Sequence, residues 1–375
     1  MNRTAEGHDA RGKLDMKDLT ERELASFREE IAALLDETTD RLGQEDVDYV
    51  TLVARVSRYL EIAGRVLIHA SLDPVSWSVG VASLAGHFIL ENMELGHNIL
   101  HGQYDWMEDP RFDSRTYAWD NVIADGLWKK EHNGQHHAFT NIVGKDPDVC
   151  YGLYRMTDKV KWYPYHLVQP VSIFVNFLVF EYAIAAYVTG IVDRLAPKNL
   201  NTGKIGGKDG RAGAEFAWKM TRKNFKNYVF YPALGGLFFP KILAGNYLAS
   251  VLRNVWAATV IYCGHFTENA RMFTEEEAEA MGKEGYWYRQ VLASGNFTGG
   301  KFLSILSGHL NYQIEHHLFP RVPAWRYRQL APRVREICEK HGVFYNTGTF
   351  SSQFRGVVRR MVRHAVPRRA GIAEA

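Results

Sequence analysis

Histidine residues gather in three short clusters of this chain, and imidazole is a nitrogen ligand for iron, copper and zinc. The clusters are His97-x-x-x-His101, His132-x-x-x-His136-His137 and Gln313-x-x-His316-His317, and they hold seven of the fifteen histidines. Residues three or four apart share one face of a helix, so each cluster can direct its side chains toward a common point. The spacing predicts a metal site, and the number of imidazoles favours more than one ion.

A lone histidine, His265, directly follows the apolar run 246–263 in the sequence IYCGHFTEN. A lone histidine is usually structural, but a metal ligand at a helix end would occupy this position. Two six-coordinate ions need roughly eight or nine protein nitrogens, whereas zinc needs about four ligands. The candidate ligands are His97, His101, His132, His136, His137, His265, His316 and His317, with Gln313 or His309 as a further candidate.

Acidic residues near two clusters can orient ligating imidazoles by accepting their second N–H. Glu94 lies one turn before His97, and Asp146 and Asp148 follow the second cluster in GKDPD. The two aspartates can equally be turn residues around Pro147. Only one Glu-x-x-His motif occurs, which disfavours the soluble di-iron bundles, and the His-Glu-x-x-His motif of zinc proteases is absent from the sequence.

The segments around the clusters read GHNILHGQYDW, KKEHNGQHHAFTNIVGKDPD and GHLNYQIEHHLFP. They resemble the three histidine boxes of the membrane fatty acid desaturases, and the third box, led by Gln313, resembles the front-end and related acyl-CoA or acyl-lipid branches. The resemblance extends from about residue 50 to about residue 340. It implies two iron ions, a ligand role for His265, and insertion of a cis double bond into an acyl chain with O2 and two electrons.

Apolar segments predict an all-α fold, an integral membrane helical bundle of about four segments. The resemblance implies a cytosolic helical cap that holds the di-iron site. The segments are 51–71, 74–95, 165–192 and 228–263. Because the boxes must share one side of the membrane, the chain between the second and third boxes crosses an even number of times. Either 165–192 crosses once and 228–263 returns, or 165–192 is a hairpin or interfacial helix and 228–263 forms a two-leg hairpin. Charge favours the second arrangement and length the first.

Three regions are predicted: an N-terminal tail with an amphipathic helix (1–50), the desaturase domain (51–345) and a basic C-terminal tail (346–375). In the first region, Thr20 and Glu23 form a capping-box pattern before a helix expected over 20–42. The arginines of 355–369 suggest a surface for an electron donor, for anionic lipid or for the phosphates of an acyl-CoA.

The expected partners follow from this chemistry. A fatty acyl substrate, linked to coenzyme A or lipid, would occupy an apolar tunnel, for which the candidate wall residues are Trp106, Trp119, Trp128, Phe139 and Tyr312. The His-Pro-Gly-Gly haem motif of a fused cytochrome b5 domain does not occur in the sequence, so a separate donor is expected, a flavin and iron–sulfur reductase or a ferredoxin. The formal net charge of +3 does not favour nucleic acid.

Two other classes compete with a desaturase. An alkane or fatty acid hydroxylase would use the same metal platform and differ only in the fate of the substrate radical. A histidine-rich metal transporter would place its ligands inside membrane segments. Here the boxes follow or lie outside the apolar runs, which counts against transport.

Overall fold

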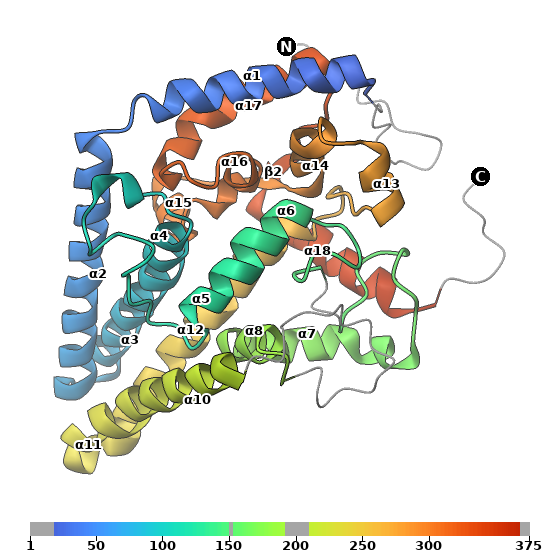
Figure 1. Cartoon of the computed structure of the whole chain (residues 1–375). Coiled ribbons are helices and arrows are strands. Elements are labelled where there is room, and N and C mark those ends of the chain that lie inside the picture. The colour runs from blue at the N-terminus through green and yellow to red at the C-terminus, as the bar shows by residue number, and fades with distance from the viewer. Residues whose placement is uncertain (1–18, 150–152, 192–209, 368–375) are drawn as a thin grey trace.

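The computed structural model describes residues 19–149, 153–191 and 210–367 (Figure 1). Within these ranges the structure is helical, apart from one pair of short parallel strands, β1 (Asn296–Thr298) and β2 (Thr347–Thr349). The prediction of an all-α fold is therefore confirmed. The two strands join segments about fifty residues apart and so fasten the C-terminal part of the chain to the centre.

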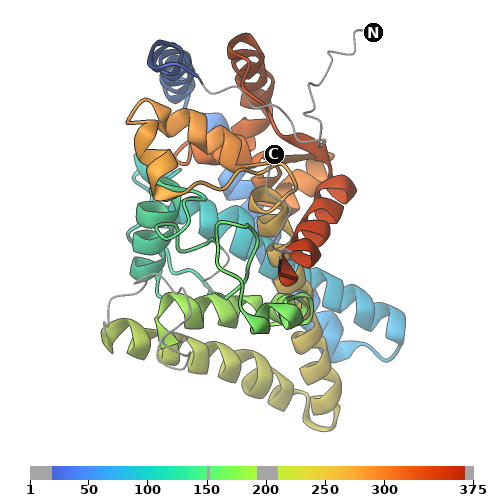
Figure 2. The same ribbon diagram turned by 90° about the vertical axis from the view of Figure 1, so that its right-hand side faces the viewer.

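Three long helices form the body of the molecule: α2 (Gln44–Ala70), α3 (Pro74–Ile89) and α12 (Phe239–His265). Helix α3 packs against both of the others. The turn between α2 and α3 lies at the same end of the molecule as the turn between α11 (Tyr231–Leu234) and α12 (Figure 1). We call this the hairpin end. The opposite end, the cap end, carries α1 (Glu21–Thr39) and α17 (Tyr327–His341), as Figure 2 also shows.

Helix α1 confirms the expected amphipathic helix and its cap. The Thr20 hydroxyl accepts from the Glu23 backbone N–H, and the Glu23 carboxylate accepts from the Thr20 backbone N–H. Its buried face packs on α14 (Gly285–Ala293) and α17 through Leu24, Phe27, Ile31 and Leu34. The described part of the predicted N-terminal region is thus part of the cap and not a separate tail.

The predicted C-terminal tail also folds back onto the body. Strand β2 pairs with β1, and α18 (Phe350–Ala365) packs against α12 and against α7 (Gln169–Leu178). Two of its arginines are engaged: Arg360 donates to three backbone carbonyls, and Arg363 pairs with Glu268. Arg368 and Arg369, which belong to the predicted basic surface, lie outside the described residues.

The apolar segments do not form simple straight spans. No single helix among the described residues combines the length and apolarity needed to cross a bilayer. Segment 165–192 is two short helices, Pro164–Leu178 and Phe180–Val188 (α8), bent by 102°. Among the described residues, only this bent pair has the length and composition of a membrane span. The helix breaks at Val179, so a crossing by this segment would be bent, and the bend is equally compatible with a hairpin. The count of about four membrane segments stays a prediction.

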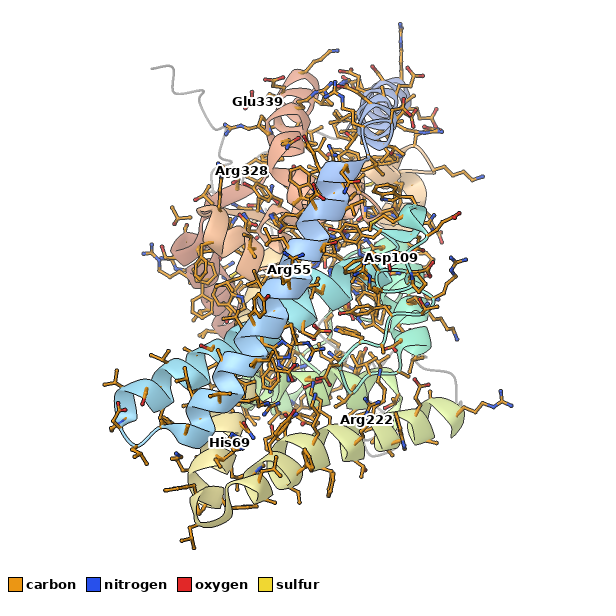
Figure 3. All side chains as sticks on the ribbon, turned by 90° about the vertical axis from the view of Figure 1, so that its left-hand side faces the viewer. Arg55, His69, Asp109, Arg222, Arg328 and Glu339 are labelled. Carbon is orange, nitrogen blue, oxygen red and sulfur yellow. The ribbon has the colours of Figure 1, made fainter. Side chains whose placement is uncertain are left out.

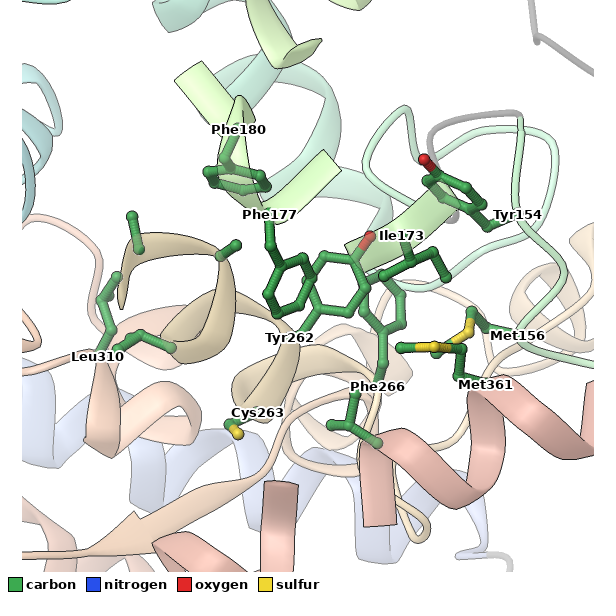
Figure 4. Close-up of a cluster of buried hydrophobic side chains, with 14 of the residues drawn as sticks. Tyr154, Met156, Ile173, Phe177, Phe180, Tyr262, Cys263, Phe266, Leu310 and Met361 are labelled. Atoms are coloured by element: carbon green, nitrogen blue, oxygen red, sulfur yellow. The ribbon is translucent and has the colours of Figure 1, made fainter. Parts of the chain in front are cut away.

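One hydrophobic core surrounds the C-terminal half of α12. Tyr262, Cys263 and Phe266 pack there against Ile173, Phe177 and Met361 (Figure 4). A second core lies at the cap end beneath α1 and α17. Together the two cores fix the end of α12, from which His265 projects between them.

Candidate metal centre

The first histidine box lies on a continuation of α3. The chain passes from α3 into a π-helical segment, Leu90–His97, and then into α4 (Asn98–Leu100). Such wide turns inside helices are frequent at functional sites. The rings of His97 and His101 pack edge to face with centroids 4.6 Å apart. The Asn98 side chain fixes His97, because its Oδ1 lies 3.1 Å from Nδ1 of His97 while its amide donates to the Glu94 carbonyl.

The second box has the same construction. Helix α5 (Asp125–Trp128) runs into a π-helical segment, Lys129–His136, and then into α6 (His137–Phe139). Nδ1 of His136 lies 2.9 Å from the buried carboxylate of Asp146, which also accepts the backbone N–H groups of Asn141 and Asp148. His132 lies farther from its carboxylate, 3.4 Å from Asp148. These carboxylates hold the outer nitrogens of both rings.

The third box lies on α16 (Gln313–Leu318), a short helix that is buried throughout. Nδ1 of His317 lies 3.1 Å from the Gln290 side-chain oxygen and 3.2 Å from the Thr140 hydroxyl. Nδ1 of His316 lies 3.5 Å from the Tyr327 hydroxyl. Neutral groups therefore orient both rings.

Glu315 anchors this helix from its other side. Its carboxylate accepts from Tyr345 and Asn296, and Asn296 also accepts the backbone N–H of Ile314. Burial raises the pKa of Glu315 to about 7, against the effect of the two hydrogen bonds. A buried, bonded acid between two site residues therefore sets the position of α16.

His265, at the end of α12, meets the third box directly. Its Nε2 lies 3.3 Å from Nε2 of His317 and 2.9 Å from the side-chain nitrogen of Gln313. Residue 264 must be small here, because a Cβ on Gly264 would lie 2.8 Å from the Gln313 side chain. The structure thus places Gln313 against the centre, where the sequence left a choice between it and His309.

The eight predicted histidines converge on two adjacent groups. His97, His101, His132 and His316 form the first group, and His136, His265 and His317 form the second. His137 lies between them, because it forms a further group with His316 and His317. Within each group the candidate ligand atoms all lie within 4.8 Å of one another. Four separate segments of the chain therefore supply one compact set of imidazoles.

Seven buried ring nitrogens of this set lack hydrogen-bond partners among the described residues. These atoms are Nε2 of His101, His132, His136 and His316, Nδ1 of His265 and both ring nitrogens of His137. An unsatisfied buried nitrogen is costly unless something binds it. Burial, and then the neighbouring rings, hold the pKa of His101, His137, His316 and His317 well below its usual range. Neutral imidazole is the form that binds metal, so these residues fit a metal ion.

His136 differs in its electrostatics. Burial lowers its pKa, but the carboxylates of Asp146 and Asp148 outweigh burial and raise the pKa to about 9. A group that holds a proton this strongly is also a strongly basic ligand when a metal displaces that proton. The second group therefore contains one imidazole that its surroundings make more electron-rich than the others.

Glu94 and His309 do not have the partners that their spacing suggested. Glu94 accepts from the Tyr49 hydroxyl at 2.7 Å and lies 3.0 Å from Nδ1 of His309. The expectation that Glu94 orients a ligating imidazole of its own helix is corrected, because His97 bonds to Asn98 instead. His309 belongs to neither group, since its backbone is left-handed (φ 56°) and interrupts the helix before Gln313.

A cavity opens beside the two groups. His97, His132, His136, His265 and Gln313 line it on one side. Apolar residues of α8 and α12 line it elsewhere, among them Phe180, Ile184, Val188, Ala257 and Ile261. Glu181, which accepts from Lys223 and Arg253, also lies in the wall. An apolar chain in this cavity would lie against the imidazoles.

Two of the five predicted tunnel residues line this cavity. Trp119 and Trp128 do so, and Trp128 stacks on His132 with ring centroids 4.5 Å apart. Trp119 requires a glycine opposite it, because a Cβ on Gly96 would lie 2.0 Å from its ring nitrogen. The assignments of Trp106, Phe139 and Tyr312 are corrected. Trp106 is 40% exposed in a turn after the first box, while Phe139 and Tyr312 pack against the core at the cap end.

Several orienting residues carry no motif in the sequence. Asn98, Thr140, Gln290 and Tyr327 each contact a ring nitrogen of a clustered histidine. A short polar residue beside a histidine in an otherwise apolar stretch is the available signal for Asn98. Gln290 and Tyr327 lie on other helices than the histidines they contact, so the spacing of residues in the sequence could not reveal these contacts.

Comparison with known proteins identifies the family. The sequence model of the family described as fatty acid desaturase matches residues 74–349. The chain is 36% identical over 360 residues to the NADPH-dependent stearoyl-CoA 9-desaturase of Mycobacterium tuberculosis, which covers 93% of this chain and 82% of that protein. It is 24% identical over 270 residues to the sn-1 linoleoyl-lipid 6-desaturase of a Synechocystis species, covering 68% and 70% of the two chains. The chain therefore belongs to the fatty acid desaturase family, and it is an acyl desaturase.

Proposed function

We propose that this enzyme introduces a cis double bond into the acyl chain of an acyl-CoA or acyl lipid, with two iron ions held by the clustered histidines. The observation that carries the proposal is the pair of adjacent groups of buried imidazoles with unpartnered inward nitrogens. Eight imidazoles exceed what a single zinc ion takes, and an all-nitrogen set suits iron. The third box, led by Gln313, supports the acyl-CoA or acyl-lipid branch.

The residues have distinct tasks in this proposal. His97, His101, His132 and His316 would hold one ion, and His136, His265 and His317 the other, with His137 beside both. When bound, the ions supply the activation of O2 that removal of hydrogen from an unactivated methylene requires. Asp146, Gln290 and Asn98 hold the outer nitrogens so that the rings cannot rotate away.

The cavity positions the substrate. Its apolar walls on α8 and α12 favour an alkyl chain, and only the methylenes that lie beside His97, His132 and His265 come within reach of the centre. Holding the reacting methylenes at a fixed place provides positional selectivity. Trp128, which stacks on the His132 imidazole, forms the cavity wall beside that ring and would shield the acyl chain from water.

Exposed apolar side chains support a site of action at a membrane, with the centre facing the cytoplasm. At the hairpin end, Leu72 is 88% exposed, Val75 73% and Leu237 99%. Apolar residues of α2 and α7, among them Tyr59, Ile62 and Phe174, are also exposed. Many exposed apolar side chains on neighbouring turns of the hairpin end fit a membrane or protein interface. The histidine groups lie toward the cap end, beyond these exposed turns.

The experiment that tests the function is expression of the full chain together with a ferredoxin and its NADPH-dependent reductase. Iron in the purified protein and the fatty acids of the cells are then measured. We expect about two iron ions per chain and new monounsaturated acyl chains. Unchanged double-bond content with an active donor present would contradict the proposal, and hydroxylated acyl chains in place of unsaturated ones would assign the chain to the hydroxylases.

A further inference from the structure

A groove that shares no lining residue with the acyl cavity carries the next inference, which rests on the proposed function. It lies between the start of α2, α15 (Lys301–Leu306) and the start of α17. Its lining residues are Tyr49, Lys301, Ser304, Ile305, His309, Trp325, Arg328 and Gln329. Figure 3 shows Arg328 and Asp109 on opposite sides of α2.

The reaction itself creates the need for a docking surface. Removing two hydrogens from CH2–CH2 and reducing O2 to two waters consumes two further electrons and two protons. The substrate supplies only its two hydrogens with their electrons, so the other two electrons come from outside. A protein that donates these electrons must bind at a surface from which contacting residues lead to the histidine groups.

Hydrogen bonds connect the groove to His97. Tyr49, in the groove wall, donates to Glu94 at 2.7 Å, and His309, in the wall beside it, lies 3.0 Å from the other carboxylate oxygen. Asn98 donates to the Glu94 carbonyl at 3.0 Å, and its oxygen lies 3.1 Å from Nδ1 of His97. Two residues, Glu94 and Asn98, therefore lie between Tyr49 in the groove wall and His97, a candidate ligand of the first group.

A second set of contacts leads from the same groove to His316. Trp325 stacks on Tyr49 with ring centroids 5.6 Å apart. Two residues later, the Tyr327 hydroxyl lies 3.5 Å from Nδ1 of His316. The groove thus leads to two imidazoles of the first group. It reaches His97 through Glu94 and Asn98, and it reaches His316 through the backbone that joins Trp325 to Tyr327.

The charge of the groove selects the partner. Lys301 and Arg328 are exposed, and neither makes an ion pair with any other residue that the structure describes. The lining contains no acidic residue, and the exposed acids Glu45 and Asp48 lie outside it. On α18, Arg360 and Arg363 are engaged by carbonyls and by Glu268, whereas Arg359 is exposed. A positive rim around aromatic residues fits an acidic protein surface.

We propose that this groove is the docking surface for an acidic one-electron carrier, an iron–sulfur protein of the ferredoxin class. Lys301 and Arg328 attract and orient the carrier, and Trp325 and Tyr49 form the contact through which two successive electrons pass toward the first histidine group. The reduced cluster of the carrier is oxidised once for each electron, and two encounters complete one turnover.

The test compares charge reversal at the groove with charge reversal on α18. One variant is the double substitution Lys301→Glu and Arg328→Glu. The control is Arg359→Glu, which changes an exposed arginine of α18. Activity is measured with the iron-loaded full chain in two ways: with increasing concentrations of a plant-type ferredoxin reduced by its NADPH-dependent reductase, and with a small-molecule reductant that needs no docking.

We expect the groove variant to raise the KM for the ferredoxin about tenfold at low salt, with less difference at high salt. Its rate with the small-molecule reductant should match that of the wild type, and the control should change the KM by less than about twofold. An unchanged KM in the groove variant would overturn the docking site, as would a larger effect from Arg359→Glu. Product with the small-molecule reductant but none with the ferredoxin would overturn the choice of carrier, whereas absence of product with both would count against the proposed function.

Discussion

The two histidine groups differ in what holds their rings. In the first group, His97 contacts an amide and His316 a tyrosine hydroxyl, and the nearest carboxylate, Asp148, is 3.4 Å from His132 and one-quarter exposed. In the second group, His136 lies 2.9 Å from the fully buried Asp146. The first group has four imidazoles, whereas the second has three with the Gln313 amide beside them.

This difference shows two ways to build a nitrogen-rich metal site. With metal bound as proposed, the first group would gain affinity from the number of its rings. The second has fewer rings, and a buried carboxylate makes one of them a stronger ligand. Because Asp146 also bonds the backbone of Asn141 and Asp148, the same carboxylate organises the loop after the second box.

Removing one ring from each group should have the largest effect. We expect His316→Ala and His136→Ala each to lower activity by more than about a hundredfold, because an ion that loses one ligand and its orientation is held poorly. Iron bound per chain, measured by plasma mass spectrometry, should fall to about one or below. A variant that kept two ions and full activity would remove that histidine from the centre.

Loss of the buried carboxylate should have the next largest effect and should separate the groups. Asp146→Asn keeps the shape of the side chain but removes its charge, so we expect a loss of iron affinity or activity of about 10- to 100-fold. Asp148→Asn is the matched control, and its effect should be several-fold smaller because its contact is longer and partly exposed. Iron release to a chelator measures both. Equal rates for the two variants would show that the second group does not depend on its carboxylate.

The sequence predicted the members of the centre better than their surroundings. The eight histidines were predicted because residues four apart on a helix share a face, and because the three boxes and the position of His265 resemble those of the desaturases. Glu94 and His309 were misassigned because both inferences assumed continuous α-helix. The π-helical segment at Leu90–His97 and the left-handed backbone at His309 change the direction of these side chains, and spacing alone does not reveal either feature.

The same limit applies to the fold. The helical class, the cap of α1 and the break before α12 follow from local patterns in the sequence. The 102° bend within 165–192 does not follow from such patterns, because Val179 is not a helix-breaking residue. The bend depends on how Phe177 and Phe180 enter the core around α12. Trp106, Phe139 and Tyr312 were assigned to the tunnel on aromatic character, which a core residue shares.

Substitutions of Gln313 should sharpen the comparison by changing the second group directly. Gln313→Leu removes the amide that contacts His265, and we expect a loss of activity of about tenfold or less, since a neutral amide is a minor ligand or orienting group. Gln313→His supplies a further imidazole and should retain iron more strongly than Gln313→Leu against a chelator. The opposite order of iron retention would show that Gln313 serves packing alone.

The smallest effect on the centre is expected at His309, which lies apart from both groups. His309→Ala leaves one oxygen of the buried Glu94 without its partner, so the free energy of unfolding should fall by roughly 1–3 kcal/mol. Iron per chain should stay at the wild-type value, because His309 contributes to neither group. Thermal unfolding and iron content measured on the same sample separate the two quantities. His309→Gln, which can still donate to Glu94, should recover most of the lost stability. Iron lost in both variants at unchanged stability would instead make His309 a ligand and would give the first group five imidazoles, widening its difference from the second.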